Sequence, residues 1–252
     1  MLARAACMLA LSACASKVGP PRYRVVHIDT LAPEKATQFE ASRRAFVVEL
    51  RRTGASDLRG RFFQVVGVGF LTLRTLARFG ELDERGPAVA RAMQGVPAEA
   101  RERYDRLSDE ALVFPHASEV WVVDEDLGYA PAGAALTETS AGAARLVIEE
   151  TRPDTASEER YGAVWEEIKR ALGKTRYPLA RIAYRSVYGG GRLVTMWLAG
   201  SPGELAAAPT VEAALTGELG AARCAELLAA WDACVLRREM HELVPRPDLS
   251  SP

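Results

Sequence analysis

The chain has 252 residues, of which 48% are hydrophobic and 26% are charged, and its formal net charge is −1. This hydrophobic fraction can build the core of one large domain or of two medium ones. The near-neutral charge, with no basic stripe or RNA-binding aromatic cluster, argues against a nucleic-acid-binding protein. No apolar run after residue 20 reaches the ~18–20 residues that a membrane-spanning helix needs.

The N-terminus carries a targeting pattern. Residues 1–13 read MLARAACMLALSA, with one Arg followed by small and apolar residues, which is typical of a short signal peptide. The LSAC motif at residues 11–14 resembles the lipobox of bacterial lipoproteins. That resemblance implies a lipid on Cys14, a tether over residues 14–21 and a place in the bacterial cell envelope. Ala15, where inner-membrane lipoproteins carry Asp, implies the outer membrane, facing the periplasm. Cleavage after Ala15, or an apolar tail without a targeting role, remain open alternatives.

The first half of the chain predicts the element order β-α-β-β-α-β. Residues 23–29 are rich in β-branched residues, which favour strands. After Pro33, apolar residues recur on one helical face until Gly54, a residue type that commonly ends helices. Gly67-Val68-Gly69 separates two apolar runs and predicts a tight hairpin. The predicted elements are strand 23–29, helix 33–54, strands 61–66 and 70–76, a helical stretch from Pro87 to Ala111 with a break near residues 95–97, and strand 119–123.

The second half repeats this order after a linker. Residues 124–143 are small and polar, with Gly and Pro, and predict the linker itself. Asp154 is a suitable N-cap for the following helix, because its carboxylate can accept a bond from a free backbone N–H. The predicted boundaries define two units, 22–123 and 144–245, and a tail, 246–252. The predicted elements are strand 145–150, helix 154–173, strands 179–188 and 192–199, helical structure from Pro209 to residue 232, and strand 235–243.

The two halves share residues at a constant spacing of 122 positions, which predicts an internal duplication. The alternative is that two hairpins carry Gly independently, because tight turns favour Gly. The matched pairs include Gly67 and Gly189, Gly69 and Gly191, Pro87 and Pro209, Phe39 and Tyr161, and Leu71 and Leu193.

The element order is that of the ferredoxin-like unit, whose helices cover only one face of its sheet. The other face would be an exposed apolar patch unless a second copy covered it. We therefore expect an α+β protein of two ferredoxin-like repeats packed as an intrachain dimeric α/β barrel. An obligate homodimer is then unnecessary, and a monomer or weak homo-oligomer is expected.

Two stretches carry a family resemblance. The opening YRVVHIDTLAPEKATQFE is similar to the start of NIPSNAP-like and antibiotic-monooxygenase-like barrels. The closing RPDLS at residues 246–250 is similar to the end of uncharacterised bacterial proteins with this duplicated layout. The resemblance to fused dimeric α/β barrels spans residues 22–245, and it implies a fold and a ligand space between the sheets. It implies no activity.

The strand patterns give a candidate cavity. In residues 23–29, alternation places His27 and Asp29 on one face and Val26 and Ile28 on the other. We expect Val26 and Ile28 to meet the helices, so that His27 and Asp29 face the space between the sheets. The remaining strands add further polar residues to that space. The candidate cavity residues are His27, Asp29, Arg181, Arg185, Glu239 and His241. Alternatively, these residues pair across strands or lie at exposed sheet edges.

No motif identifies a reaction, so enzymatic activity and cofactor are unknown. The chain lacks GxSxG, zinc-ligand spacing and a phosphate-binding Gly loop followed by a helix, and no metal is predicted. One hypothesis is a non-catalytic envelope protein that binds a small molecule or acts as an interaction module. The alternative is an enzyme or haem-binding protein of the dimeric α/β-barrel type, with His27 or His241 as base or ligand.

Overall fold

The structure is a computed structural model. The predicted signal peptide, Cys14 and the tether lie outside the residues that it describes. Among those residues, no helix is long and apolar enough to cross a membrane. The described residues are 23–54, 60–76, 78–132, 137–138, 140–152, 154–187 and 192–251, with the backbone alone at 114–117.

The first-half elements follow the predicted order, with differences at their ends. The predicted break near residues 95–97 separates the two last helices, but Pro87 lies inside the first of them instead of starting it. The closing strand is longer than the predicted 119–123 and takes in part of the predicted linker. The elements are β1 (Tyr23–Leu31), η1 (Pro33–Lys35), α2 (Ala36–Arg52), β2 (Arg61–Val65), β3 (Gly69–Leu76), α3 (Glu81–Gln94), α4 (Ala98–Ala111) and β4 (Leu112–Tyr129).

The second half repeats the order and adds one helix. Asp154 caps its helix as predicted, accepting a hydrogen bond from the backbone N–H of Ser157. That helix passes the predicted end at Gly173 and stops at Arg176, which has a left-handed backbone with φ of 54°. The short α6 was not predicted. The elements are β5 (Ala143–Thr151), α5 (Thr155–Thr175), β6 (Ala180–Ser186), β7 (Arg192–Ala199), α6 (Pro202–Ala207), α7 (Val211–Leu219), α8 (Ala221–Asp232) and β8 (Val235–Pro245).

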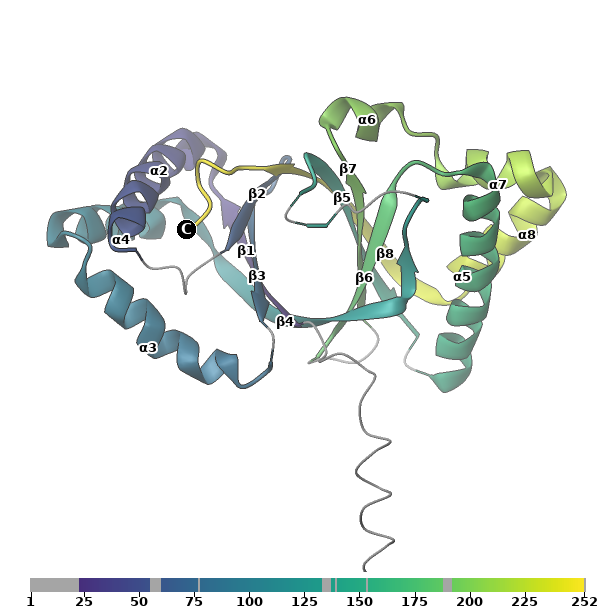
Figure 1. Cartoon of the computed structure of the whole chain (residues 1–252), viewed down its shortest axis with the longest axis horizontal. Coiled ribbons are helices and arrows are strands. Elements are labelled where there is room, and N and C mark those ends of the chain that lie inside the picture. The colour runs from purple at the N-terminus through teal and green to yellow at the C-terminus, as the bar shows by residue number, and fades with distance from the viewer. Residues whose placement is uncertain are drawn as a thin grey trace, which may run out of the picture.

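The strands form one closed antiparallel barrel in the order β1-β3-β2-β8-β5-β7-β6-β4. Figure 1 shows α2, α3 and α4 on one side of this barrel and α5, α7 and α8 on the other. The predicted α+β class is confirmed. The halves join edge to edge, β2 to β8 and β4 to β6, and this closure leaves none of the described strands at an open sheet edge that could aggregate.

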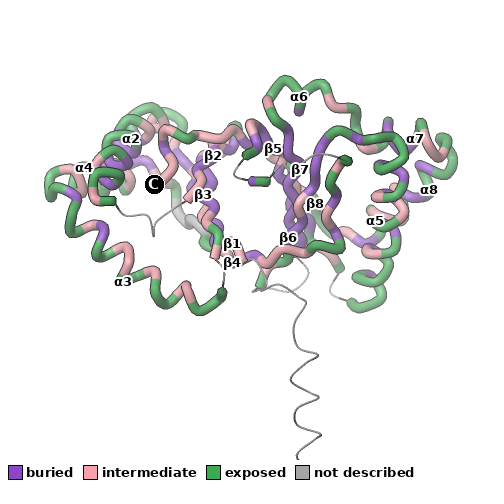
Figure 2. The backbone as a smooth tube through the Cα atoms, in the orientation of Figure 1, coloured by how far each residue is buried: buried purple, intermediate pink, exposed green. Residues whose placement is uncertain are grey.

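The barrel interior is a packed core, and this reverses one prediction. Val26 lies in that core, together with Trp121, Tyr184 and Met196, and Ile28 packs against it. Figure 2 shows that most barrel strands are buried and the outer turns of the helices are exposed, whereas β8 is exposed or partly buried along most of its length. His27 and Asp29, on the opposite face of β1, therefore point outward toward the helices. Alternation tells which residues share a face, but not which face lies inside.

The constant spacing also fails across the third strand of each half. Phe39 and Tyr161 are both buried on the sheet-facing side of their helices, as the spacing requires. Leu71, however, lies in the barrel core, whereas Leu193 lies in the cluster beneath α5. Because strand side chains alternate between faces, the two strands are displaced by an odd number of residues.

Candidate functional site

A pocket of about 300 Å³ lies between the outer face of the first-half sheet and helices α2, α3 and α4. β1 contributes His27 and Asp29, and β3 contributes Arg74. Arg43 enters from α2 and Arg85 from α3. Three guanidinium groups thus converge on a pocket that contains one carboxylate, which gives it a positive potential.

The guanidinium group of Arg74 has fewer hydrogen-bond partners in the described part of the chain than its buried donors require. Its Nε and Nη1 atoms are buried and have no hydrogen-bond partner there. Burial, together with the neighbouring charges of Arg85 and Arg43, lowers the pKa of Arg74 to about 10. Gly60 leaves room for this side chain, since a Cβ at that position would lie 2.9 Å from Arg74 Nε. An unpaired buried charge is costly, and an anion in the pocket would relieve that cost.

In Arg43, by contrast, each of the three guanidinium nitrogens donates a hydrogen bond. Its Nη1 donates to the hydroxyl of Tyr104 at 3.0 Å. Its Nε donates to the carbonyl oxygen of Leu249 at 3.2 Å, and its Nη2 to Ser251 Oγ at 3.3 Å. The guanidinium carbon also lies 5.1 Å from the centre of the Phe62 ring, within reach of a cation–π contact. Arg43 is thereby fixed at the pocket wall.

The opposite wall presents polar acceptors. His27 Nδ1 lies 2.6 Å from Ser118 Oγ, and His27 Nε2 lies 2.9 Å from Asp29 Oδ1. His27 and Ser118 face each other across β1 and β4. On α4, Ser108 Oγ is buried with no partner among the described residues. The pocket therefore combines cationic donors with hydroxyl and carboxylate groups.

The predicted cavity residues do not form one cavity. Arg181 lies under α5 in the other half, where its guanidinium carbon is 3.7 Å from the centre of the Trp165 ring. Arg185, on the same face of β6, pairs with Asp124 at 2.5 Å. Only His27 and Asp29 line the pocket described above.

Glu239 and His241 occupy a third place. They pair across β5 and β8 with Ile148 and Leu146, two residues of the barrel core, and therefore lie on the barrel-facing side of β8. His241 Nε2 is 3.6 Å from a Glu239 carboxylate oxygen. Both residues lie on β8, so this contact is within one strand and differs from the cross-strand pairing that the alternative interpretation described.

None of the three arginines of the pocket was predicted from the sequence, although two carried a signal. Arg74 interrupts the apolar run FLTLRTL of β3. Arg43 lies one helical turn after Phe39, on the apolar face of α2. A charged residue on an apolar face is either paired or functional, because its burial is costly. Arg85 carried no comparable signal.

A larger pocket, of about 610 Å³, lies beside β4 and β6. Two of its buried charges, Arg24 and Glu138, neutralise each other. Arg24 Nε donates to a carboxylate oxygen of Glu138 at 2.8 Å, and the Tyr184 hydroxyl donates to the same oxygen at 2.6 Å. Burial alone would raise the pKa of Glu138, but these bonds outweigh it and lower that pKa. Arg181 also lines this larger pocket, and its buried Nε has no partner among the described residues. Its Nη1 and Nη2, however, donate to the Leu127 carbonyl oxygen and the Tyr161 hydroxyl. This pocket therefore leaves fewer guanidinium donors unsatisfied than the pocket of Arg74 does.

No protein-family model and no curated protein sequence matches the chain. Solved structures do match its fold. A candidate monooxygenase from Fusobacterium nucleatum aligns with a TM-score of 0.53 at 8% identity, over 91% of this chain and 94% of that one. An anthrone oxidase-like protein aligns with a TM-score of 0.53 at 10% identity, over 90% and 92%. A chlorite dismutase variant from Candidatus Nitrospira defluvii aligns with a TM-score of 0.53 at 11% identity, over 94% and 95%. At these identities, the similarity shows a shared fold alone.

Proposed function

We propose that this chain is a non-catalytic binding protein for a small organic anion, held in the pocket beneath α2 and α4. The observation that carries the proposal is Arg74, whose buried Nε and Nη1 atoms have no partner among the described residues. Two further guanidinium groups line the same pocket. Arginine recognises carboxylate and phosphate groups through charge-assisted hydrogen bonds, so an anion would satisfy this cluster.

The pocket also limits the size and character of the ligand. Its volume of about 300 Å³ is at the lower end of the range for small-molecule sites. Phe39, Phe62 and Tyr104 contribute aromatic surface to the lining. A carboxylate or phosphate on a compact, partly apolar body combines these features.

The enzyme or haem-binding alternative has support from the fold only. A haem iron needs an imidazole nitrogen as a ligand. Both ring nitrogens of His27 already have partners at 2.6 and 2.9 Å. His241 lies on the barrel-facing side of β8, away from the pocket. His27 therefore does not fit a haem ligand in this pocket, and His241 does not line it.

Calorimetric titration with phenyl phosphate and benzoate, as small anionic probes, tests the proposed function. We expect saturable binding of one probe molecule per chain, weaker at high ionic strength because salt screens the charges. An absorption spectrum of the purified protein supplies the second readout. Absence of binding by both probes at millimolar concentration would overturn the anion proposal, and a Soret band would favour the haem alternative.

We also propose that the two halves descend from one ferredoxin-like unit. The support is the strand order, which runs last, first, third, second in each half: β4-β1-β3-β2 and β8-β5-β7-β6. A fused pair of this kind closes its own barrel, which supports a monomer or a weak homo-oligomer.

The envelope location is a further proposal, supported by the lipobox-like LSAC motif at residues 11–14. Cys14→Ser removes the thiol that would carry the lipid. We expect this variant to move from the membrane fraction to the soluble fraction, because it would lack the lipid that anchors the protein through Cys14. Membrane fractionation of bacterial cells that express each form is the measurement. Equal membrane association of both forms would count against the lipid anchor.

A further inference from the structure

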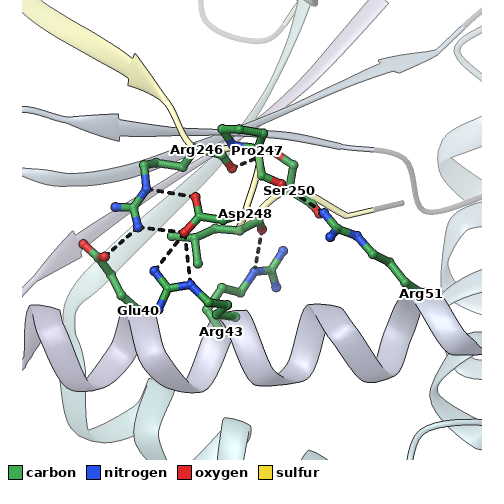
Figure 3. Close-up of polar contacts among 9 residues, drawn as sticks. Glu40, Arg43, Arg51, Arg246, Pro247, Asp248 and Ser250 are labelled. Atoms are coloured by element: carbon green, nitrogen blue, oxygen red, sulfur yellow. Dashed lines mark hydrogen bonds and ion pairs between the residues drawn. The ribbon is translucent and has the colours of Figure 1, made fainter.

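The last residues of the chain cross from the second half to the first. After β8, residues 246–251 run along the start of β2, as Figure 3 shows beside helix α2. The backbone N–H of Arg246 donates to the carbonyl oxygen of Phe62 at 2.8 Å. The backbone N–H of Ser251 donates to the carbonyl oxygen of Gly60 at 3.1 Å. We name residues 246–251 the C-terminal strap.

Ionic contacts fasten the strap to α2. Asp248 accepts a hydrogen bond from Arg44 at 2.8 Å, and Arg246 bonds Glu40 at 2.7 Å. Arg51 donates to two carbonyl oxygens of the strap, as Figure 3 shows. Hydrogen bonds from Arg246 and Arg44 lower the pKa of Asp248 to about 2. The Asp248 carboxylate is thus charged at any physiological pH.

The strap also forms part of the wall behind the anion pocket. Leu249 is fully buried in a cluster with Phe39 and Phe62, two residues that line the pocket. Two of the three hydrogen bonds of the Arg43 guanidinium go to the strap, at Leu249 and Ser251. The side chain of Arg74 packs against Gly60, the residue that Ser251 bridges.

We infer that the C-terminal strap is the positioning element of the anion site, because it holds Arg43 in place beside Arg74. This inference rests on the proposed function. A guanidinium group that is fixed before the ligand arrives loses less conformational entropy on binding. Residues 246–251 therefore raise anion affinity without touching the anion.

Positioning and simple charge predict opposite results for Asp248→Asn. Loss of a negative charge near the pocket would by itself strengthen anion binding. Release of the strap would weaken it, because Arg43 would lose its fixed place. We expect phenyl phosphate affinity to fall about tenfold, the lower end of the effect of residues that orient a ligand-binding group. Ser251→Ala, which changes no charge, should weaken binding in the same direction.

Glu49→Gln is the matched control. Glu49 is on α2 and bonds Arg52 on the same helix, so its replacement changes the charge equally and leaves the strap attached. We expect its affinity to stay within about twofold of the original protein, as for a screened surface charge. Asp248→Glu should retain most of the affinity, because it keeps the ionic contacts. All affinities are measured well below each variant's unfolding temperature.

The Nε–H signal of Arg43 in ¹⁵N NMR gives a readout that does not need a ligand. We expect slow solvent exchange in the original protein and fast exchange in Asp248→Asn and Ser251→Ala. If Asp248→Asn binds phenyl phosphate as tightly as Glu49→Gln does, the strap inference is wrong while the anion site stands. If the original protein binds neither probe, the proposed function fails. The strap inference then fails with it, and unchanged Arg43 exchange in the strap variants would show in addition that the strap does not hold Arg43 in place.

Discussion

Arg74→Met should abolish most anion binding and at the same time stabilise the unliganded protein. The side chain supplies two buried donors without partners among the described residues, and a hydrogen bond to a charged group is worth about 1.5–3 kcal/mol. We therefore expect an affinity loss of about 10- to 100-fold for phenyl phosphate. Met keeps a similar length and places no charge beside Arg43 and Arg85. Calorimetric titration and urea unfolding of both proteins measure the two effects.

The lowered pKa of Arg74 explains why Arg74→Met should stabilise the unliganded protein. Burial and the two neighbouring arginines lower this pKa to about 10, well below the usual pKa of an arginine, and each pKa unit corresponds to about 1.4 kcal/mol. A lowered pKa means that the charged form destabilises the folded state at every pH below about 10. The penalty disappears as the pH rises from about 10 through the higher pKa of the unfolded chain. Arg74→Met should therefore gain about 1–3 kcal/mol at pH 7, by an amount that is unchanged up to pH 9.

Arg78→Met is the matched control for this prediction. Arg78 lies just after β3 and pairs with Glu84, and its side chain is 67% exposed. The same loss of charge there should change the free energy of unfolding by less than about 0.5 kcal/mol and leave anion binding almost unchanged. The proposal would be contradicted if the Arg74→Met protein were less stable than the original protein and still bound phenyl phosphate with the same affinity.

Glu149→Gln should be the most destabilising of these changes. Glu149 is completely buried. It accepts hydrogen bonds from Arg238 at 2.7 Å and from the Tyr161 hydroxyl at 2.6 Å. The same hydroxyl accepts a bond from the buried Arg181 at 3.1 Å. One carboxylate therefore compensates two guanidinium groups beneath α5, and removal of one partner from a buried ionic pair costs about 3–5 kcal/mol.

The chemistry of Tyr161 keeps this network in a single protonation state. Burial raises the pKa of Tyr161; Arg181 opposes that shift, and Glu149 reinforces it. The phenol thus remains a hydrogen-bond donor to Glu149 at physiological pH. With Gln at position 149, the Tyr161 hydroxyl keeps an acceptor, but the buried Arg181 loses the negative charge beyond that hydroxyl. Among the described residues, Arg238 keeps only Asp232 as a counter-charge. A loss of about 3 kcal/mol lowers the unfolding temperature of a chain of this size by about 6–12 °C, which differential scanning calorimetry can measure.

Glu150→Gln provides the matched control on the same strand. Glu150 is exposed and lies opposite Arg237 on β8. We expect its replacement to shift the unfolding temperature by no more than about 2 °C, as usual for a surface position. Equal shifts for Glu149→Gln and Glu150→Gln would show that the buried network does not carry the predicted stability.

The predictions that were confirmed depend on neighbours along the chain. Asp154 caps α5 because its side chain reaches a backbone N–H within the same turn. The hairpin at residues 66–68 forms where Gly67 takes a backbone with φ of 77°, which other residues disfavour. At Gly69, a Cβ would lie 2.0 Å from the carbonyl oxygen of Asp29, so the close approach of β1 and β3 also requires glycine.

The candidate site could be predicted only in part from neighbours along the chain. His27 and Asp29 were correctly placed on one face of the first strand, but that face points to the helices and not to the barrel interior. Nothing local distinguishes the two faces, because both carry apolar residues. Which face lies inside depends on how the halves close, and the closed interior accommodates Val26 and other bulky apolar residues.

By itself, the sequence determined the order of strands and helices, the α+β class and which side chains share a face. These properties follow from backbone propensity, turn chemistry and periodicity within some twenty residues. Only the tertiary structure decided that the two sheets join by their edges, and that Arg43, Arg74 and Arg85 meet at one pocket. It also placed the C-terminal strap against Arg43, 206 residues away in sequence. Contacts of such separation are set by barrel closure and core packing, which no local pattern records.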